Sequence, residues 1–392
     1  MRRVPESNRC NRSFADSRVS TSPTRHAPIF CPLLYCIVSL YANRIKAKSH
    51  VQYPYMSTIT VQAPANIAFI KYWGNNEDNL PLNNNISMTL SNCQTTTSIQ
   101  KSPDWQEDVV ELQDNNGTYH VLSRETIKER KAYEHIERIR TIAGASEKVH
   151  IRSRNSFPTD SGIASSASGF CALTGAVCLA YNLKEIFDDK LQLSKLVRLS
   201  GSASAARSVY GGFVELLAHS NHDNSYAVQL APESHWALAD VVAIISMKSK
   251  ETPTSEGHRS APTSPYFQTR LNEMQQRIVS TRDAIRDRDF EKLGVAIEAD
   301  TVSMHAIMMT STPPLYYWEP GTIEIIKQIR DWRKTDKLQA YFSIDAGANV
   351  HVICEQKDSA EVEKRLNDIS CVAQTITNEP SVGVREVSEH LF

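Results

Sequence analysis

The sequence predicts an α+β protein with two domains. Alternating apolar residues near residue 59 and between residues 86 and 100 predict strands, whereas long amphipathic segments after residue 265 predict helices. Strands and helices that are grouped along a chain, rather than regularly alternating, are typical of α+β folds. A chain of 392 residues is also long for a single core, which favours two domains.

The composition narrows the class of protein. Hydrophobic content of 41% and charged content of 22% are ordinary for a globular protein. A formal net charge of -1 gives no support to a nucleic-acid partner, and no run of about 18 apolar residues predicts a membrane span. The 8 cysteines form no C-x-x-C pair, so we expect reduced thiols in a cytoplasmic enzyme rather than a disulfide framework or a zinc site.

Residues 1–56 differ from the rest because arginine and serine dominate them and only Glu6 and Asp16 are acidic. Three interpretations remain open: an organelle transit peptide, a disordered tail, or an artefact of gene prediction with Met56 as the true start. We favour the third, because the periodic sequence begins abruptly at Ser57. The predicted division is a disordered or mis-annotated extension (1–56), an N-terminal domain (57–235) and a C-terminal domain (236–392).

The N-terminal domain is predicted to open with strands and to continue with a helix and a further strand. The alternation of Ile59, Val61 and Ala63 predicts the first strand. The other predicted elements are strands at 86–90 and 94–100, a hairpin at 108–121 that turns at 115–117, a helix at 125–143 and a strand at 149–154.

A small, polar run with the sequence P-T-D-S-G-I-A-S-S-A, residues 158–167, leads directly into an apolar helix that extends to Ala180. A helix start has unpaired N–H groups and a partial positive charge, and small residues allow an anion to approach the backbone. The run therefore suits a phosphate group, and Ser165 and Ser166 would add hydroxyl donors. The alternative is an ordinary first turn of a core helix, capped by Thr159 or Ser161.

A second predicted helix, 188–199, runs into G-S-A-S-A-A-R-S at 201–208. A single arginine, Arg207, among so many small residues is suited to clamp an anion. The alternative is a close helix–helix crossing with a surface arginine.

The C-terminal domain is predicted to be an α+β sandwich with its helices on one face of the sheet. An apolar strand at 238–247 is followed by a polar loop at 248–265. The remaining predicted elements are helices at 266–286, 290–308, 321–335 and 359–369 and strands at 339–344 and 350–354. Asp345 lies in a glycine-containing turn between the last two strands, where it can serve as a general base or as a plain turn residue.

Seven stretches, in order, resemble one family. They are A-P-A-N-I-A-F-I-K-Y-W-G (63–74), N-x-x-I-S-x-T-L-S (83–91), the run at 158–167, G-S-A-S-A-A-R-S-x-Y-G-G-F-V-E (201–215), A-P-E-S-H-W (231–236), M-H-A (304–306) and D-A-G-A-N (345–349). Together they resemble the mevalonate diphosphate decarboxylases of the GHMP kinase superfamily. The resemblance covers about residues 58 to 388, and the plain kinases of the superfamily lack K-Y-W-G.

The resemblance implies a two-domain GHMP kinase fold, with an N-terminal ribosomal S5 domain 2-like domain and a C-terminal ferredoxin-like domain. It implies ATP and Mg²⁺ as cofactors and a phosphorylated mevalonate as the substrate, bound between the domains. The reaction would be ATP-dependent decarboxylation of (R)-5-diphosphomevalonate to isopentenyl diphosphate, and the assembly would be a possible homodimer.

The resemblance also assigns roles to residues. Asp345 would accept or orient the proton of the tertiary alcohol, Lys71 would keep Asp345 ionised, and Arg207 would hold the departing carboxylate. The predicted substrate-binding residues are Ala68, Tyr72, Trp73, Ser202, Ser204 and Arg207. The predicted ATP-binding residues are Pro158, Ser161, Gly162, Ile163, Ala164, Ser165 and Ser166, and Ser166 is also a candidate ligand for Mg²⁺.

The sequence departs from the family pattern at three places. Asn75 and Asn76 follow K-Y-W-G, where a basic residue is frequent; Asn85 stands where serine is usual; and Ser255 replaces an arginine of bacterial members. Losing a cation near the second phosphate could shift preference to phosphomevalonate, which would give isopentenyl phosphate. Two further alternatives are a mevalonate kinase that does not decarboxylate its product and a non-catalytic binding protein on the same scaffold.

Overall fold

The computed structural model describes residues 57–76, 80–158, 163, 165–246 and 252–392. Contacts divide the chain into two units, residues 1–48 and 49–392, and all described residues belong to the second unit. The predictions for residues 1–56 therefore lie outside the described residues. Residues 49–392 form one compact unit that is not divided further. The predicted domain boundary between residues 235 and 236 therefore stays a prediction.

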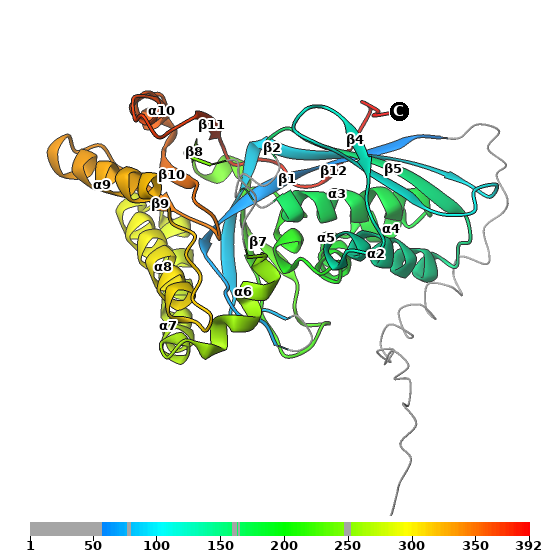
Figure 1. Ribbon diagram of the computed structural model, residues 1–392, viewed down its shortest axis with the longest axis horizontal. Coiled ribbons are helices and arrows are strands. Elements are labelled where there is room, and N and C mark those ends of the chain that lie inside the picture. The colour runs from blue at the N-terminus through cyan, green and yellow to red at the C-terminus, as the bar shows by residue number, and fades with distance from the viewer. Residues whose placement is uncertain (1–56, 77–79, 159–162, 164, 247–251) are drawn as a thin grey trace, which may run out of the picture. The chain divides into compact units, whose positions relative to one another are not determined.

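The first part of this unit is built on a large sheet (Figure 1). Its strands are β1 (Ile59–Ile70), β2 (Asn85–Ser102), β3 (Val109–Gln113), β4 (Tyr119–Val121), β5 (Lys148–Asn155), β6 (Phe213–Leu216), β7 (Ala227–Ala231) and β12 (Arg385–Val387). The order is β12-β1-β2-β5-β3-β4, with β6 paired to β2 and β7 paired to β6. The predicted strands 86–90 and 94–100 are one continuous strand, β2. Its pairing with β1 changes register between Pro64 and Asn66, but the strand continues through this irregularity.

Helices cover one face of this sheet. They are α2 (Ile127–Ala143), α3 (Ser165–Ala180), α4 (Lys184–Asp188) and α5 (Lys190–Arg198). The apolar helix α3 contacts β1 and β2, and α2, α4 and α5 contact α3 (Figure 1). The α2 boundaries follow from its caps: the Thr126 side chain accepts a hydrogen bond from the Glu129 N–H, and Gly144 ends the helix with φ 61°.

The second part has a smaller antiparallel sheet in the order β11-β8-β10-β9. Its strands are β8 (Leu238–Ile244), β9 (Ala340–Ser343), β10 (Val350–Glu355) and β11 (Gln374–Asn378). Its helices are α6 (Thr254–Ser260), α7 (Phe267–Asp287), α8 (Phe290–Thr310), α9 (Pro320–Thr335) and α10 (Ser359–Asn367). Helix α6 was not predicted, because its sequence T-S-E-G-H-R-S is polar and short.

The prediction that helices lie on one face of this sheet was wrong. Leu238 and Val242 of β8 pack with residues of α7 and α8. Their neighbours Val241 and Ala243 point to the other face and pack with residues of α9 and α10. Both faces are therefore covered: every residue of β8 is buried, and all of them except Asp240 are apolar.

The hydrophobic core is continuous between the two parts. Ile67 and Phe69 of β1 belong to the same buried cluster as Met274 and Ile278 of α7. Helix α8 also contacts β1. The end of β1 is therefore fixed against the helices of the second part, and this is where Lys71 follows the strand. No helix of the described residues is long and apolar enough to cross a membrane.

The chain returns to the first sheet at its C-terminal end. Strand β12 pairs with β1, with Val387 opposite Thr60 and Arg385 opposite Gln62. The residues after it also bind this sheet, since the Leu391 N–H donates to Ser98 Oγ at 2.9 Å. This strand was not predicted from its three residues, nor were β6 and β7.

Candidate active site

Lys71 and Asp345 meet where the two parts of the protein join. The Lys71 Nζ is 2.6 Å from Asp345 Oδ1, and the two side chains are 3% and 24% exposed. The same Nζ donates to Ser343 Oγ at 2.9 Å and to the Ala68 carbonyl at 3.0 Å. Ser343 ends β9, so the strand fixes both Ser343 and the turn that carries Asp345. The predicted pairing of Lys71 with Asp345 is thus present in the structure.

The surroundings favour the ionised form of Asp345. Burial raises the pKa of this carboxyl group, but Lys71, His351 and Arg207 lower it, and the resulting pKa lies below the ordinary value. A carboxylate that is ionised but still partly exposed can accept a proton from a bound alcohol.

Arg207 lies in a 3-10 turn, η1 (Ala203–Ser208), and is buried. Its Nε and Nη2 donate to Asn66 Oδ1 at 3.0 and 2.9 Å, and its Nη1 donates to Asn85 Oδ1. Burial lowers the pKa of the guanidinium group, while Tyr72 and Asp345 oppose this effect. The two amide oxygens hold the guanidinium without neutralising it, so its charge remains available for an anion.

Tyr72 and Trp73 have different environments. Tyr72 is half-buried, and burial raises its pKa while Arg207 and Ser204 lower it, which places the phenol beside those two residues. Trp73 is 2% exposed and packs with Phe267 and Met304 in the core of the second part. The predicted substrate contact of Trp73 stays a prediction.

His258 of α6 inserts between these two aromatic side chains. Its ring centroid is 4.9 Å from that of Tyr72 and 4.5 Å from that of Trp73. Its Nδ1 accepts a hydrogen bond from the Gly74 N–H at 3.0 Å. Burial lowers the pKa of His258 to about 3, so the ring is neutral and its proton is on Nε2 at physiological pH.

Three of the serines predicted to bind substrate or ATP form one chain of contacts. Ser166 Oγ, in the first turn of α3, is 3.3 Å from Ser202 Oγ, which is 3.1 Å from Ser204 Oγ. The Ser204 carbonyl accepts from the Asn66 amide at 3.3 Å, and Asn66 binds Arg207. The start of α3 is thereby connected to the Arg207 site.

The described residues fit an anion at the start of α3. The first turn of α3 has no acidic residue, and Ser166 is exposed there while Ser165 is half-buried. Pro158 is half-buried, and the Ile163 side chain is buried in the core, so Ile163 could contribute only main-chain groups. Predicted ATP-binding residues Ser161, Gly162 and Ala164 lie outside the described residues.

Magnesium has no preformed carboxylate site within the part of the chain that the structure describes. No group of three or more His, Cys, Asp or Glu side chains there could hold a metal ion. The residues present therefore fit a Mg²⁺ ion that takes most of its oxygens from phosphates, with Ser166 as a candidate hydroxyl ligand.

Four residues that position the site were not predicted. Asn66 and Asn85 hold Arg207, and Arg270 and Asp300 bind the main chain of Lys71. Asn66 lies within a stretch that carried the resemblance, and Asn85 was noted only as a departure from the family. Arg270 and Asp300 lie on helices, where nothing local in the sequence separates them from surface charges.

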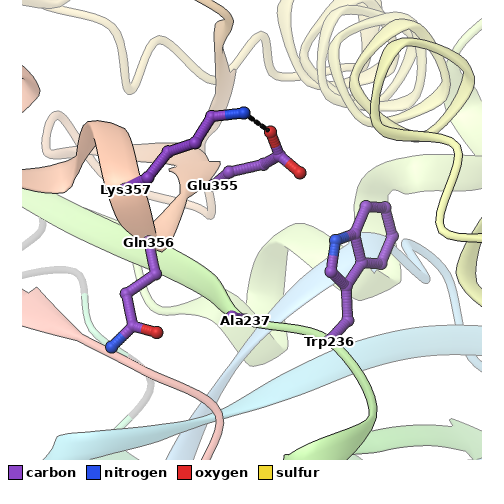
Figure 2. Close-up of a pocket in the computed structure, with 5 residues that line it drawn as sticks. All are labelled: Trp236, Ala237, Glu355, Gln356 and Lys357. Atoms are coloured by element: carbon purple, nitrogen blue, oxygen red, sulfur yellow. Dashed lines mark hydrogen bonds and ion pairs between the residues drawn. The ribbon is translucent and has the colours of Figure 1, made fainter.

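A surface hollow of about 430 Å³ lies elsewhere, lined by Trp236, Ala237, Glu355, Gln356 and Lys357 (Figure 2). Its two charged side chains bind each other, since Lys357 Nζ is 2.6 Å from Glu355 Oε2. None of the predicted site residues lines this hollow, so it adds nothing to the site.

Comparison with protein-family models gives two matches. Residues 63–227 match the diphosphomevalonate decarboxylase-like N-terminal domain, and residues 240–389 match the mevalonate 5-diphosphate decarboxylase C-terminal domain. Together the two matches span nearly all of the described residues.

Similar proteins are found in both sequence and structure comparisons. The diphosphomevalonate decarboxylase of Debaryomyces hansenii is 36% identical over 327 residues, which cover 78% of this chain and 81% of that protein. A solved structure described as MDDEF in complex with MVAPP, AMPPCP and magnesium has a TM-score of 0.75 and 31% identity, covering 86% of this chain and 100% of its own. A second solved structure is that of the mevalonate diphosphate decarboxylase from Enterococcus faecalis, described in terms of its mevalonate diphosphate mediated ATP binding mechanism. It has a TM-score of 0.75 and 30% identity, and the match covers 86% of this chain and 100% of that one.

Proposed function

The chain belongs to the mevalonate diphosphate decarboxylase family of the GHMP kinase superfamily, and on that premise we propose how its residues carry the reaction. The activity is ATP-dependent decarboxylation of diphosphomevalonate in the mevalonate pathway. The observation that carries the residue assignment is the ion pair of 2.6 Å between Lys71 and Asp345, with the buried Arg207 close enough to affect Asp345.

Asp345 is the group that accepts or orients the proton of the tertiary 3-hydroxyl. A tertiary alcohol is a poor nucleophile, so it needs a carboxylate within hydrogen-bond reach. Lys71 keeps that carboxylate ionised and adds positive charge where negative charge develops on the transferred group.

Arg207 holds the substrate carboxylate. Its planar fork can bind a carboxylate through two parallel N–H groups, and Asn66 and Asn85 fix the plane of the fork. After ATP has phosphorylated the 3-hydroxyl, a fixed carboxylate allows its C–C bond to align with the C–O bond to the phosphate. CO₂ and phosphate then leave together, and the electron pair of the broken C–C bond forms the C=C bond of the product. Tyr72, Ser202 and Ser204 lie beside Arg207 and are proposed substrate contacts.

ATP binds at the start of α3, through Ser165, Ser166 and main-chain N–H groups. ATP supplies the phosphoryl group, and Mg²⁺ would neutralise its phosphates when bound. The related structure with AMPPCP and magnesium supports both ligands for this chain.

The test is a product analysis with both phosphorylated mevalonates. Purified protein with ATP and Mg²⁺ is given diphosphomevalonate or phosphomevalonate, and ADP, phosphate and CO₂ are measured while products are identified by mass. Equal amounts of ADP and CO₂ from diphosphomevalonate are expected. ADP without CO₂ would instead indicate a kinase, and a large preference for phosphomevalonate would support the hypothesis raised by Asn75, Asn76 and Ser255.

Two properties stay predictions: the homodimer that the resemblance implies and the cytoplasmic location expected from the cysteines. A homodimer would be detected by light scattering of the purified full chain. A cytoplasmic location would be detected by fractionation of the producing cells.

A further inference from the structure

A buried ion pair in the second part of the protein contacts the active site. Arg270 of α7 and Asp300 of α8 are 3.0 Å apart between Nη1 and Oδ1, and their side chains are 1% and 0% exposed. Arg270 Nη2 also donates to Asp300 Oδ2 at 3.3 Å. A buried ion pair is weak evidence for stability, because removing two charges from water can cost more than their attraction returns. The groups that this pair contacts therefore suggest its role.

Both main-chain polar groups of Lys71 are bound by side chains. Asp300 Oδ2 accepts from the Lys71 N–H at 2.7 Å. Arg270 Nη2 and Asn83 Nδ2 each donate to the Lys71 carbonyl at 3.1 Å. Lys71 is the first residue after β1, where the strand ladder ends, so these groups need partners from elsewhere.

We propose that Arg270 and Asp300 are positioning residues that fix the Lys71 peptide so that its ammonium group reaches Asp345. The inference rests on the proposed roles of Lys71 and Asp345. A lysine side chain is a flexible four-carbon stem, so the position of its charge depends on where its backbone is held. A displacement of about 1 Å at a reacting group can cost about 100-fold in rate.

The charged and titratable groups around Asp345 come from several elements. Lys71 and Arg207 belong to the first part, and His351 of β10 and His305 of α8 belong to the second. His351 Nδ1 is bound to Asp240 Oδ2 at 2.9 Å, and Tyr72 also lies within electrostatic reach. Lys71 donates to Asp345 directly, so loosening the Lys71 peptide should raise the Asp345 pKa while the other groups stay in place.

The experiment removes the pair without leaving an unpaired buried charge. Arg270→Met combined with Asp300→Leu replaces two charges with apolar side chains of similar volume, which in other buried pairs is often neutral for stability. We expect a cooperative unfolding transition, a kcat lowered by about 100-fold at neutral pH, and an acid limb of the kcat profile moved to higher pH. Arg270→Lys keeps the charge but loses the fork that reaches both Asp300 and the Lys71 carbonyl, and we expect a smaller change of the same kind.

A matched control is available in the first part. Asp108 forms a buried pair with Arg140, and its Oδ1 also accepts from a main-chain N–H, that of Val149, at 3.0 Å. Asp108→Asn should lower the unfolding temperature and leave kcat and its pH profile, measured per folded enzyme, unchanged. An Arg270→Lys or double-variant enzyme that is folded and keeps the wild-type kcat and pH profile would overturn the proposal.

A second readout separates this proposal from the proposed reaction. The pKa of the Asp345 carboxyl group is measured by ¹³C NMR titration without substrate. Its signal is identified as the one that is missing from the spectrum of Asp345→Asn. A higher Asp345 pKa in the folded Arg270→Lys variant supports positioning even if the wild-type protein releases no CO₂. An unchanged Asp345 pKa in the folded Arg270→Lys variant refutes the positioning role of Arg270 and Asp300, whatever the activity of that variant. If the double variant does not fold, the result for Arg270→Lys alone decides.

Discussion

Lys71→Met is the sharpest test of the proposed charge arrangement. The Nζ–Oδ1 separation of 2.6 Å corresponds to an attraction of about 6 kcal/mol at an effective dielectric constant of about 20. Removing one partner of a fully buried pair costs about 3–5 kcal/mol, and the cost here is smaller because Asp345 is 24% exposed. Burial raises the pKa of Asp345, and Lys71 is the first of the groups that lower it, so removing Lys71 should raise that pKa and shift the carboxyl group toward its neutral form. We expect kcat at neutral pH to fall on the order of 100-fold or more.

The pH dependence gives the direction of the effect. Asp345 acts as a base only when ionised, which requires a pH above its pKa. Lys71 lowers that pKa, so Lys71→Met should move the acid limb of kcat to higher pH and part of the activity should return as the pH rises. ADP and CO₂ release are followed from acidic to alkaline pH, with Lys71→Arg as the control that keeps a positive charge. If Lys71→Met binds ATP and folds normally but its acid limb stays in place, the assigned role of Lys71 is wrong.

Three other predictions address the remaining groups. Asp345→Asn should abolish turnover while ATP still binds in a fluorescence titration, and normal turnover would refute its role as base. Arg207→Met should lower CO₂ release through kcat rather than through KM, whereas a change confined to KM would indicate substrate binding alone. His258→Phe keeps the stacking on Tyr72 and Trp73 but loses the acceptor for Gly74, so we expect a folded enzyme with kcat/KM lowered by about 10-fold. His258→Asn can restore an acceptor there and should recover part of the loss; equal activities of the two variants would count against the hydrogen bond.

Long periodic segments were the predictable part of the fold. The helices at 266–286 and 290–308 agree with α7 and α8 within two residues at each end. Short strands were missed because their signal is weak: β12 has three residues, and its pairing with β1 is a contact between distant parts of the sequence. The error over the second sheet has a different cause. A strand that is apolar on both of its faces is buried on both sides, and the sequence L-A-D-V-V-A-I of β8 carries that information, with Asp240 as its one polar residue.

Some residues of the candidate site could be predicted from the sequence, and others could not. The sequence predicts the pairing of Lys71 with Asp345, because a base beside a lysine suits the chemistry and both residues lie in distinctive motifs. Asn85 shows that residue type alone does not reveal a role. It departs from the family pattern, in which serine is usual, yet its side-chain oxygen accepts a hydrogen bond from Arg207. Arg270 and Asp300 could not be predicted, because only the packing of α7 and α8 against β1 brings these two helix charges to the main-chain N–H and C=O of Lys71.

The return of β12 to the first sheet bears on how the protein folds during synthesis. Thr60, Val61 and Gln62 are synthesised long before their partners at 385–387. Until residues 385–387 have been made, this border of β1 lacks its neighbour, and an open strand border favours pairing with other chains. A nascent chain stalled before residue 385 should therefore depend on chaperones, and an isolated first part should aggregate unless a peptide covering 380–392 is supplied.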